Sequence, residues 1–196
     1  RVGYSTPCIR RRAGTSAEVI LTSWERGIEG IDIASGRSNW SLQVFDQKHV
    51  ETPIASPIVV GDLVLGTCGW LGYAMHTVAV RPGKRPGEAA DEVFRVDRGA
   101  PLCTTPVANS TLLFLWSDQG IVTCVRMADG SIAWRERVGG TFYGSPVLVG
   151  KRLICLSASG QAIVMDAAET ARVVARNPIL EGSHSTPAIA HRAMFV

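Results

Sequence analysis

The side chains that most often carry chemistry are scattered in this sequence. Its cysteines and histidines form no C-x-x-C pair, C-x-x-C-H haem site, adjacent Cys-Cys pair or H-E-x-x-H motif, and neither G-x-S-x-G nor G-x-x-x-x-G-K occurs. Asp118 and Asp166 stand alone in turn or strand-end positions, where acids are more often structural than catalytic. The sequence therefore predicts no catalytic residue, no cofactor-binding residue and no metal site. The residues concerned are Cys8, Cys68, Cys103, Cys124, Cys155, His49, His76, His184 and His191.

All five cysteines fall on or beside predicted strands. Free cysteine behaves as a small core hydrophobe, so buried structural thiols are the expected state. A disulfide between neighbouring strands, such as Cys68 to Cys103, stays open at this stage. Because five is an odd number, at least one thiol stays free within the chain.

A short element ending in Ser-Pro or Thr-Pro recurs along the whole chain. Its prolines are separated first by 50 and 49 residues and then by 40 and 41. Each interval holds four apolar runs divided by Gly, Asn and Asp turns, which is the spacing of propeller blades. The sequence predicts an all-β fold, a β-propeller of four-stranded antiparallel blades forming an incomplete ring of about four and a half blades. The prolines are Pro7, Pro57, Pro106, Pro146 and Pro187.

A single partial propeller domain is expected over residues 1–196. Its blades are predicted at about 4–45, 54–97, 103–139 and 142–181, with the start of another at 184–196. Both ends read as cut from something longer, since there is no initiator Met and the last residues look like part of a strand.

A Gly-x-x-x-Trp element closes two of these units, as Gly36 to Trp40 and Gly130 to Trp134. Phe94 is expected in the place of the tryptophan in the second unit, and Val174 in the fourth. Both tryptophans are predicted to lie between blades, where a large aromatic ring contributes buried area and ring packing.

The charge balance excludes some partners. A formal net charge of +3 is too small to imply nucleic acid, and no run of 18 apolar residues forms a transmembrane helix. Three consecutive arginines, Arg10 to Arg12, could serve an anionic partner, but a charged hairpin tip is the commoner explanation.

In a four-stranded meander, alternate turns lie at opposite ends of the sheet. An insertion after Cys68 is longer than the matching turns and rich in aromatic residues, which dominate interface hot spots. A local cap over the blade is the alternative to a contact surface. The predicted partner-binding face consists of Trp24, Trp70, Tyr73, His76, Tyr143 and His184.

A family resemblance rests on three segments of the sequence. They are V-G-D-L-V at 60–64, I-V-T-C-V-R-M-A-D-G-S-I-A-W at 121–134 and G-S-P-V-L-V at 144–149. Over essentially the whole chain, the sequence resembles the PQQ-like (quinoprotein-type) β-propeller repeat proteins of the BamB-like group. The resemblance makes Gly36/Trp40 and Gly130/Trp134 tryptophan-docking motifs. It also implies seven or eight blades and a periplasmic or extracellular location.

The resemblance leaves two functions to weigh. One is a non-catalytic binding scaffold that contacts another protein or a cell-envelope component and needs no cofactor. The alternative is a fragment of a PQQ-dependent dehydrogenase whose cofactor site lies in missing blades. The sequence contains no adjacent Cys-Cys pair and no acidic cluster with calcium spacing, which argues against the dehydrogenase.

Overall fold

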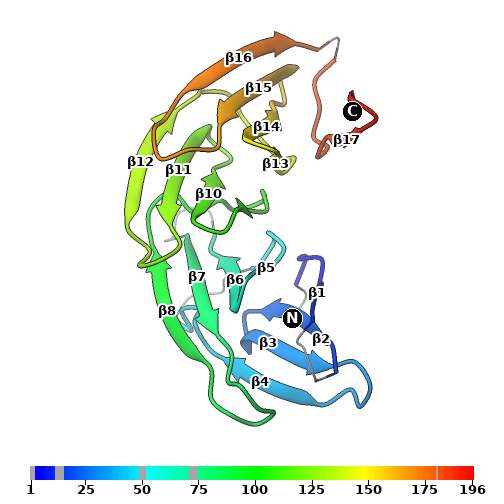
Figure 1. The fold of residues 1–196 in the computed structure, drawn as a ribbon, viewed down its shortest axis with the longest axis vertical. Helices are drawn as coiled ribbons and strands as arrows, with labels where there is room; N and C mark the ends of the chain where they lie inside the picture. The colour runs from blue at the N-terminus through cyan, green and yellow to red at the C-terminus, as the bar shows by residue number, and fades with distance from the viewer. Residues whose placement is uncertain (1–2, 12–15, 49–51, 71–74, 180) are drawn as a thin grey trace. The chain divides into compact units, whose positions relative to one another are not determined.

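The computed structural model describes residues 3–11, 16–48, 52–70, 75–179 and 181–196 (Figure 1). Every regular element in these ranges is a β-strand, so the predicted all-β class is confirmed. None of the described residues forms a helix of the length and hydrophobicity needed to cross a membrane. The chain divides into two compact units, Arg1–Arg98 and Gly99–Val196.

Unit 1 contains two four-stranded antiparallel sheets in which each strand pairs with the next along the chain. The first sheet consists of β1 (Cys8–Arg10), β2 (Glu18–Ser23), β3 (Gly27–Asp32) and β4 (Ser38–Leu42). The second consists of β5 (Ile58–Val60), β6 (Leu63–Cys68), β7 (His76–Arg81) and β8 (Asp91–Val96).

Unit 2 repeats this plan. The third sheet consists of β9 (Val107–Ala108), β10 (Leu112–Trp116), β11 (Ile121–Arg126) and β12 (Ile132–Arg137). The fourth consists of β13 (Val147–Val149), β14 (Arg152–Leu156), β15 (Gln161–Asp166) and β16 (Val173–Pro178). A two-stranded sheet follows, with β17 (Ala188–Ala190) and β18 (Ala193–Phe195). Each sheet is thus a meander, and the predicted four-stranded antiparallel units are confirmed; whether they form one domain stays a prediction.

The middle strands of the sheets are buried on both faces. All six residues of β6 and all five of β10 are buried, which explains why these runs do not alternate between polar and apolar side chains. In unit 2 the core lies between the third and fourth sheets, with Phe114 and Trp116 facing Leu153, Cys155 and their neighbours. Unit 1 has a corresponding core between its own two sheets.

Hydrogen bonds between neighbouring sheets explain the recurrent Ser-Pro and Thr-Pro elements. In unit 2 the Thr105 N–H donates to Ser145 Oγ, and the Ser145 N–H donates to Thr186 Oγ1, each at 2.9 Å. In unit 1 the Thr6 N–H donates to Ser56 Oγ at 3.1 Å. We call this series the hydroxyl ladder. It requires a hydroxyl at one fixed position per repeat, because each hydroxyl oxygen satisfies a backbone N–H of the preceding sheet.

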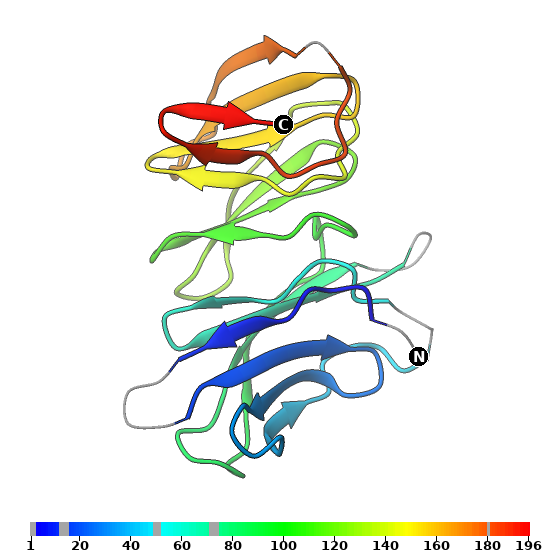
Figure 2. The same ribbon diagram turned by 90° about the vertical axis from the view of Figure 1, so that its right-hand side faces the viewer.

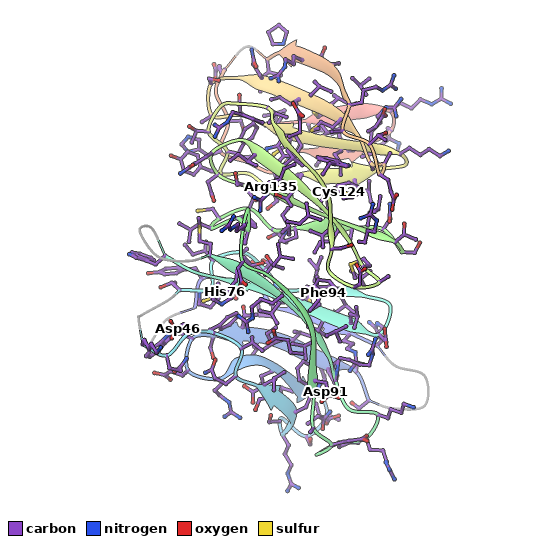
Figure 3. All side chains as sticks on the ribbon, turned by 90° about the vertical axis from the view of Figure 1, so that its left-hand side faces the viewer. Asp46, His76, Asp91, Phe94, Cys124 and Arg135 are labelled. Carbon is purple, nitrogen blue, oxygen red and sulfur yellow. The ribbon has the colours of Figure 1, made fainter. Side chains whose placement is uncertain are left out.

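In each four-stranded sheet, a β-bulge interrupts the pairing of the third and fourth strands at the same place. The shift falls after Gly30, Ala79, Cys124 and Val164, and the residues paired with these four are Trp40, Phe94, Trp134 and Ala175. Phe94 therefore occupies the predicted tryptophan position in the second sheet (Figure 3). The prediction for the fourth sheet is wrong by one residue, since Ala175 and not Val174 stands there.

A longer turn causes this error. The Asp32 N–H bonds the carbonyl of Arg37, five residues on, whereas the Asp166 N–H bonds the carbonyl of Arg172, six residues on. The extra residue displaces every later position by one. In the shorter turns Gly36 and Gly130 adopt φ of 68° and 75°, a conformation that favours glycine.

Candidate functional site

The two ends of each sheet carry different turns. In unit 1 the β5–β6 and β7–β8 turns lie at one end, and the β2–β3 turn lies at the opposite end (Figure 2). The predicted partner-binding residues belong to the end with the β2–β3 turn and the links between successive sheets. Loops on a rigid sheet scaffold are common binding sites, so the position of each residue matters.

In unit 1 the connector after β4 holds Trp24 in place. The Trp24 Nε1–H donates to the Asp46 carbonyl at 2.9 Å. The side-chain amides of Gln43 and Gln47 donate to the Trp24 carbonyl at 3.0 and 2.9 Å. The ring is half-buried, so Trp24 offers only part of its surface to a partner.

The residues of the aromatic insertion differ in exposure. Trp70 is 43% exposed, whereas His76 is only 5% exposed and packs against Phe45 with ring centroids 5.7 Å apart. Burial lowers the pKa of His76, and the ring lies near Asp46 at one end of the unit (Figure 3). A buried imidazole cannot contact a partner, which corrects the prediction for His76. Tyr73 lies outside the described residues.

In unit 2 the structure brings the two remaining residues together. The rings of Tyr143 and His184 have centroids 4.5 Å apart at an interplanar angle of 53°, and both side chains are exposed. The segments that carry them are fixed on both sides. Phe142 is fully buried and its N–H donates to the Asp118 carbonyl, while two residues after each ring the hydroxyl ladder joins Ser145 to Thr186.

The tryptophan at the end of the third sheet lies against the next sheet. Trp134 is half-buried, its ring centroid is 6.2 Å from that of Phe114, and its Nε1–H donates to the Ala168 carbonyl at 2.9 Å. Ala168 lies in the turn between β15 and β16. One hydrogen bond and one apolar contact thus join the two sheets of unit 2 at this residue.

Trp40 is placed differently. It is 6% exposed and packs in the core of unit 1, but its Nε1–H points to Glu18 Oε2 of its own sheet at 3.3 Å. The indole lies over Gly30, where an added Cβ would come within 2.2 Å of Trp40 Nε1. The two tryptophans share a register position but not a hydrogen-bond partner. Their role in docking the blades stays a prediction.

The residues that could carry chemistry have structural partners. The carboxylate of Asp118 accepts hydrogen bonds from the backbone N–H groups of Leu102 and Cys103 at 2.7 and 2.9 Å. Arg152 and Arg172 both donate to Asp166. All five cysteines are free thiols, which answers the open question of a disulfide. Desolvation raises the pKa of Cys103 to about 11, and the pKa values of Cys124 and Cys155 to about 12.

Unit 1 also contains a cavity of about 380 Å³ that the sequence did not predict. It lies at the end of the sheets opposite Trp24 and is built by three hairpins. We call it the basic groove; its lining consists of Arg10, Arg11, Gly61, Asp62, Arg81, Pro82 and Lys84. The only signal in the sequence was the run of arginines at its edge.

Residues 90–174 match the sequence model of the family described as outer membrane protein assembly factor BamB. The crystal structure of BamB from Moraxella catarrhalis superposes with a TM-score of 0.67 at 17% identity, covering 92% of this chain and 54% of that one. The family model covers less than half of the chain, and the superposition shows a shared β-propeller repeat fold. The chain spans about half the length of that BamB.

Two further solved structures resemble the chain in fold. Quinohemoprotein alcohol dehydrogenase from Comamonas testosteroni has a TM-score of 0.63 at 11% identity, covering 82% of this chain and 34% of that one. The computationally designed Ika8 protein has a TM-score of 0.67 at 10% identity, covering 95% and 53%. No curated protein sequence matches the chain. At these identities the likeness concerns the fold alone.

Proposed function

We propose that this PQQ-like propeller chain is a non-catalytic binding scaffold that mediates protein–protein or cell-envelope interactions. The observation that carries the proposal is the exposed pair of Tyr143 and His184 on a fixed backbone. The family match supports it, because that family is described as an outer membrane protein assembly factor. The proposed location is the periplasm or the cell exterior.

The pair has the properties of an interface anchor. Tyrosine is enriched at binding hot spots, and it loses little conformational entropy on binding because it has only two side-chain torsions. Tyr143 is 46% exposed although its ring already packs against His184. Buried Phe142 and the hydroxyl ladder hold the backbone, so binding costs little further ordering.

The proposal assigns no cofactor. A calcium-dependent quinone site would need a group of acidic ligands, and the described residues contain no cluster of three or more His, Cys, Asp or Glu side chains suited to a metal ion. The described residues therefore offer no such set of ligands. The dehydrogenase alternative is tested directly by assaying dye reduction with PQQ, calcium and a primary alcohol; turnover would contradict a purely binding role.

The test of the scaffold is the double variant Tyr143→Ser, His184→Ser in the whole protein. Envelope proteins are cross-linked to the wild type in cells, identified, and then measured individually for binding to each purified form. The matched control is Val149→Ser, an exposed apolar residue at the opposite end of the same sheet. We expect the double variant to lose a partner that the control keeps, while both melt within a few degrees of the wild type.

Two results would contradict the proposal. Every partner could bind the double variant as tightly as the wild type, or the control could lose the same partner. Trp70→Ser extends the test to unit 1, where this exposed side chain is the counterpart in the aromatic insertion. Retained binding with a lowered melting point would identify Trp70 as part of a local cap over its blade.

A further inference from the structure

The basic groove of unit 1 collects charged side chains from three separate hairpins, with cations from two of them. Arg10 and Arg11 come from the end of β1 and the residue after it, Asp62 from the β5–β6 turn, and Arg81 and Lys84 from the β7–β8 connection. The lining thus holds four cations and one carboxylate around a cavity of about 380 Å³. An ordinary charged hairpin tip would point its cations apart into solvent, whereas these converge.

The buried ion pair behind the groove fixes one of these cations. The Arg10 Nη1–H donates to Glu18 Oε2 at 2.9 Å, and both side chains are at least nine-tenths buried. Glu18 also accepts hydrogen bonds from Asn39 at 2.9 Å and Trp40 at 3.3 Å. A carboxylate bonded from three sides cannot rotate freely, so the guanidinium of Arg10 is held in one orientation. Its bond to Glu18 uses Nη1 alone of the three guanidinium nitrogens.

The charges of the groove do not cancel. Arg81 Nε donates to Asp62 Oδ2 at 2.7 Å, and this bond, followed by the charges of Arg81 and Arg10, holds the pKa of Asp62 below its ordinary value. Glu18 and Asp62 therefore offset Arg10 and Arg81. Arg11 and Lys84 add two further positive charges to the lining. The charge of Lys84 also acts on the carboxylate of Glu88, whereas Arg11 makes no ion pair with any residue that the structure describes.

We propose that the basic groove binds a phosphate group. Guanidinium groups present paired N–H donors that match the oxygens of phosphate, and an ammonium group adds a mobile point charge. The excess of positive charge in the lining suits a phosphate group, which is an anion at neutral pH. The cavity lies within the roughly 300–1,000 Å³ of small-molecule sites, so it has room for the group that carries the phosphate. The site is independent of the proposed protein partner.

The test measures phosphate binding to the whole protein by titration calorimetry. The probes are inorganic phosphate, glycerol 3-phosphate, and vesicles of phosphatidylcholine with or without phosphatidic acid. The test variant is Arg11→Gln, Lys84→Gln, since both side chains line the groove and none of the described residues forms an ion pair with Arg11. The control is Lys151→Gln, Arg176→Gln, which removes the same charge from exposed positions of the fourth sheet. Arg10 is left intact, because its removal would strand buried Glu18.

We expect the wild type and the control to bind one phosphate probe equally. The test variant should bind it about tenfold more weakly or worse, with an unchanged melting point, as expected for the loss of two charge-assisted hydrogen bonds. Binding of the soluble probes would identify a free phosphate ester as the source, and binding of phosphatidic acid vesicles alone would identify a lipid headgroup. Equal affinities for the test variant and the control would overturn the proposal, and so would a wild type that binds no probe.

Discussion

Replacing Trp134 with alanine tests whether this residue docks the fourth sheet on the third. The change removes a half-buried indole from the core of unit 2 and deletes the Nε1–H bond to the Ala168 carbonyl. The ring of Phe114 loses its aromatic neighbour, whose centroid lies 6.2 Å away. All of these contacts join two sheets, so their loss should weaken the whole unit rather than one strand.

The expected cost follows from the burial of the side chain. Replacing a fully buried tryptophan with alanine costs about 3–5 kcal/mol of unfolding free energy. Because Trp134 is only half-buried, the loss of its packing contacts should cost an amount near the lower end of this range or below it. The deleted hydrogen bond contributes roughly 1 kcal/mol. We therefore expect a loss of about 3 kcal/mol in the free energy of unfolding. For a chain of this size that corresponds to a melting point lower by about 6–12 °C.

The assay is urea unfolding followed by both circular dichroism and tryptophan fluorescence. Trp134→Phe keeps a ring but lacks the N–H, so it should recover about two thirds of the loss. Ile132→Ala is the control on the same strand, since that side chain is 44% exposed and should cost less than about 1 kcal/mol. A loss below about 1 kcal/mol for Trp134→Ala would refute the docking role and the strand register on which it rests.

Three further predictions concern the ladder and the thiols. Ser145→Ala deletes the acceptor of the Thr105 N–H and should lower the free energy of unfolding by about 1 kcal/mol, whereas Ser145→Thr should largely restore it; equal melting points for the wild type and the alanine variant would contradict a stabilising ladder. Desolvation raises the pKa values of Cys124 and Cys155 from 9.0 to about 12, so both should resist a thiol reagent at pH 8 until denaturant is added, as counted by mass spectrometry. Because the folded state keeps these protons, its stability is full below pH 9 and falls as the pH rises from 9 towards 12; a melting point that stays constant over that range would contradict the buried thiols.

The repeated architecture was predictable because its signals are local. Turn residues and apolar runs mark each strand, and the register position of Phe94 followed from aligning the repeats. The error at Val174 arose because a turn one residue longer leaves no trace in composition. In the structure, the pairing of Val164 with Ala175 and the backbone hydrogen bond from the Asp166 N–H to the Arg172 carbonyl reveal the longer turn.

The candidate sites were less predictable, because they depend on contacts between distant segments. The burial of His76 against Phe45 depends on how the connector after β4 folds back, which no periodicity encodes. The basic groove draws its cations from two hairpins about 70 residues apart in the chain. In the sequence Arg11 is an ordinary hairpin residue. Only the fold shows that it lines the same cavity as Arg81.

The hydroxyl ladder distinguishes positions where the fold requires a particular side chain from positions where the side chain can vary. Ser145 and Thr186 must carry hydroxyls, because each accepts a backbone N–H from the preceding sheet. The residues two positions earlier, Tyr143 and His184, are exposed, and Cys103 stands at the corresponding position of the preceding repeat. The fold therefore accepts a phenol, an imidazole or a thiol at that position. Since the ladder fixes the backbone without these side chains, their replacement should change binding while leaving folding intact.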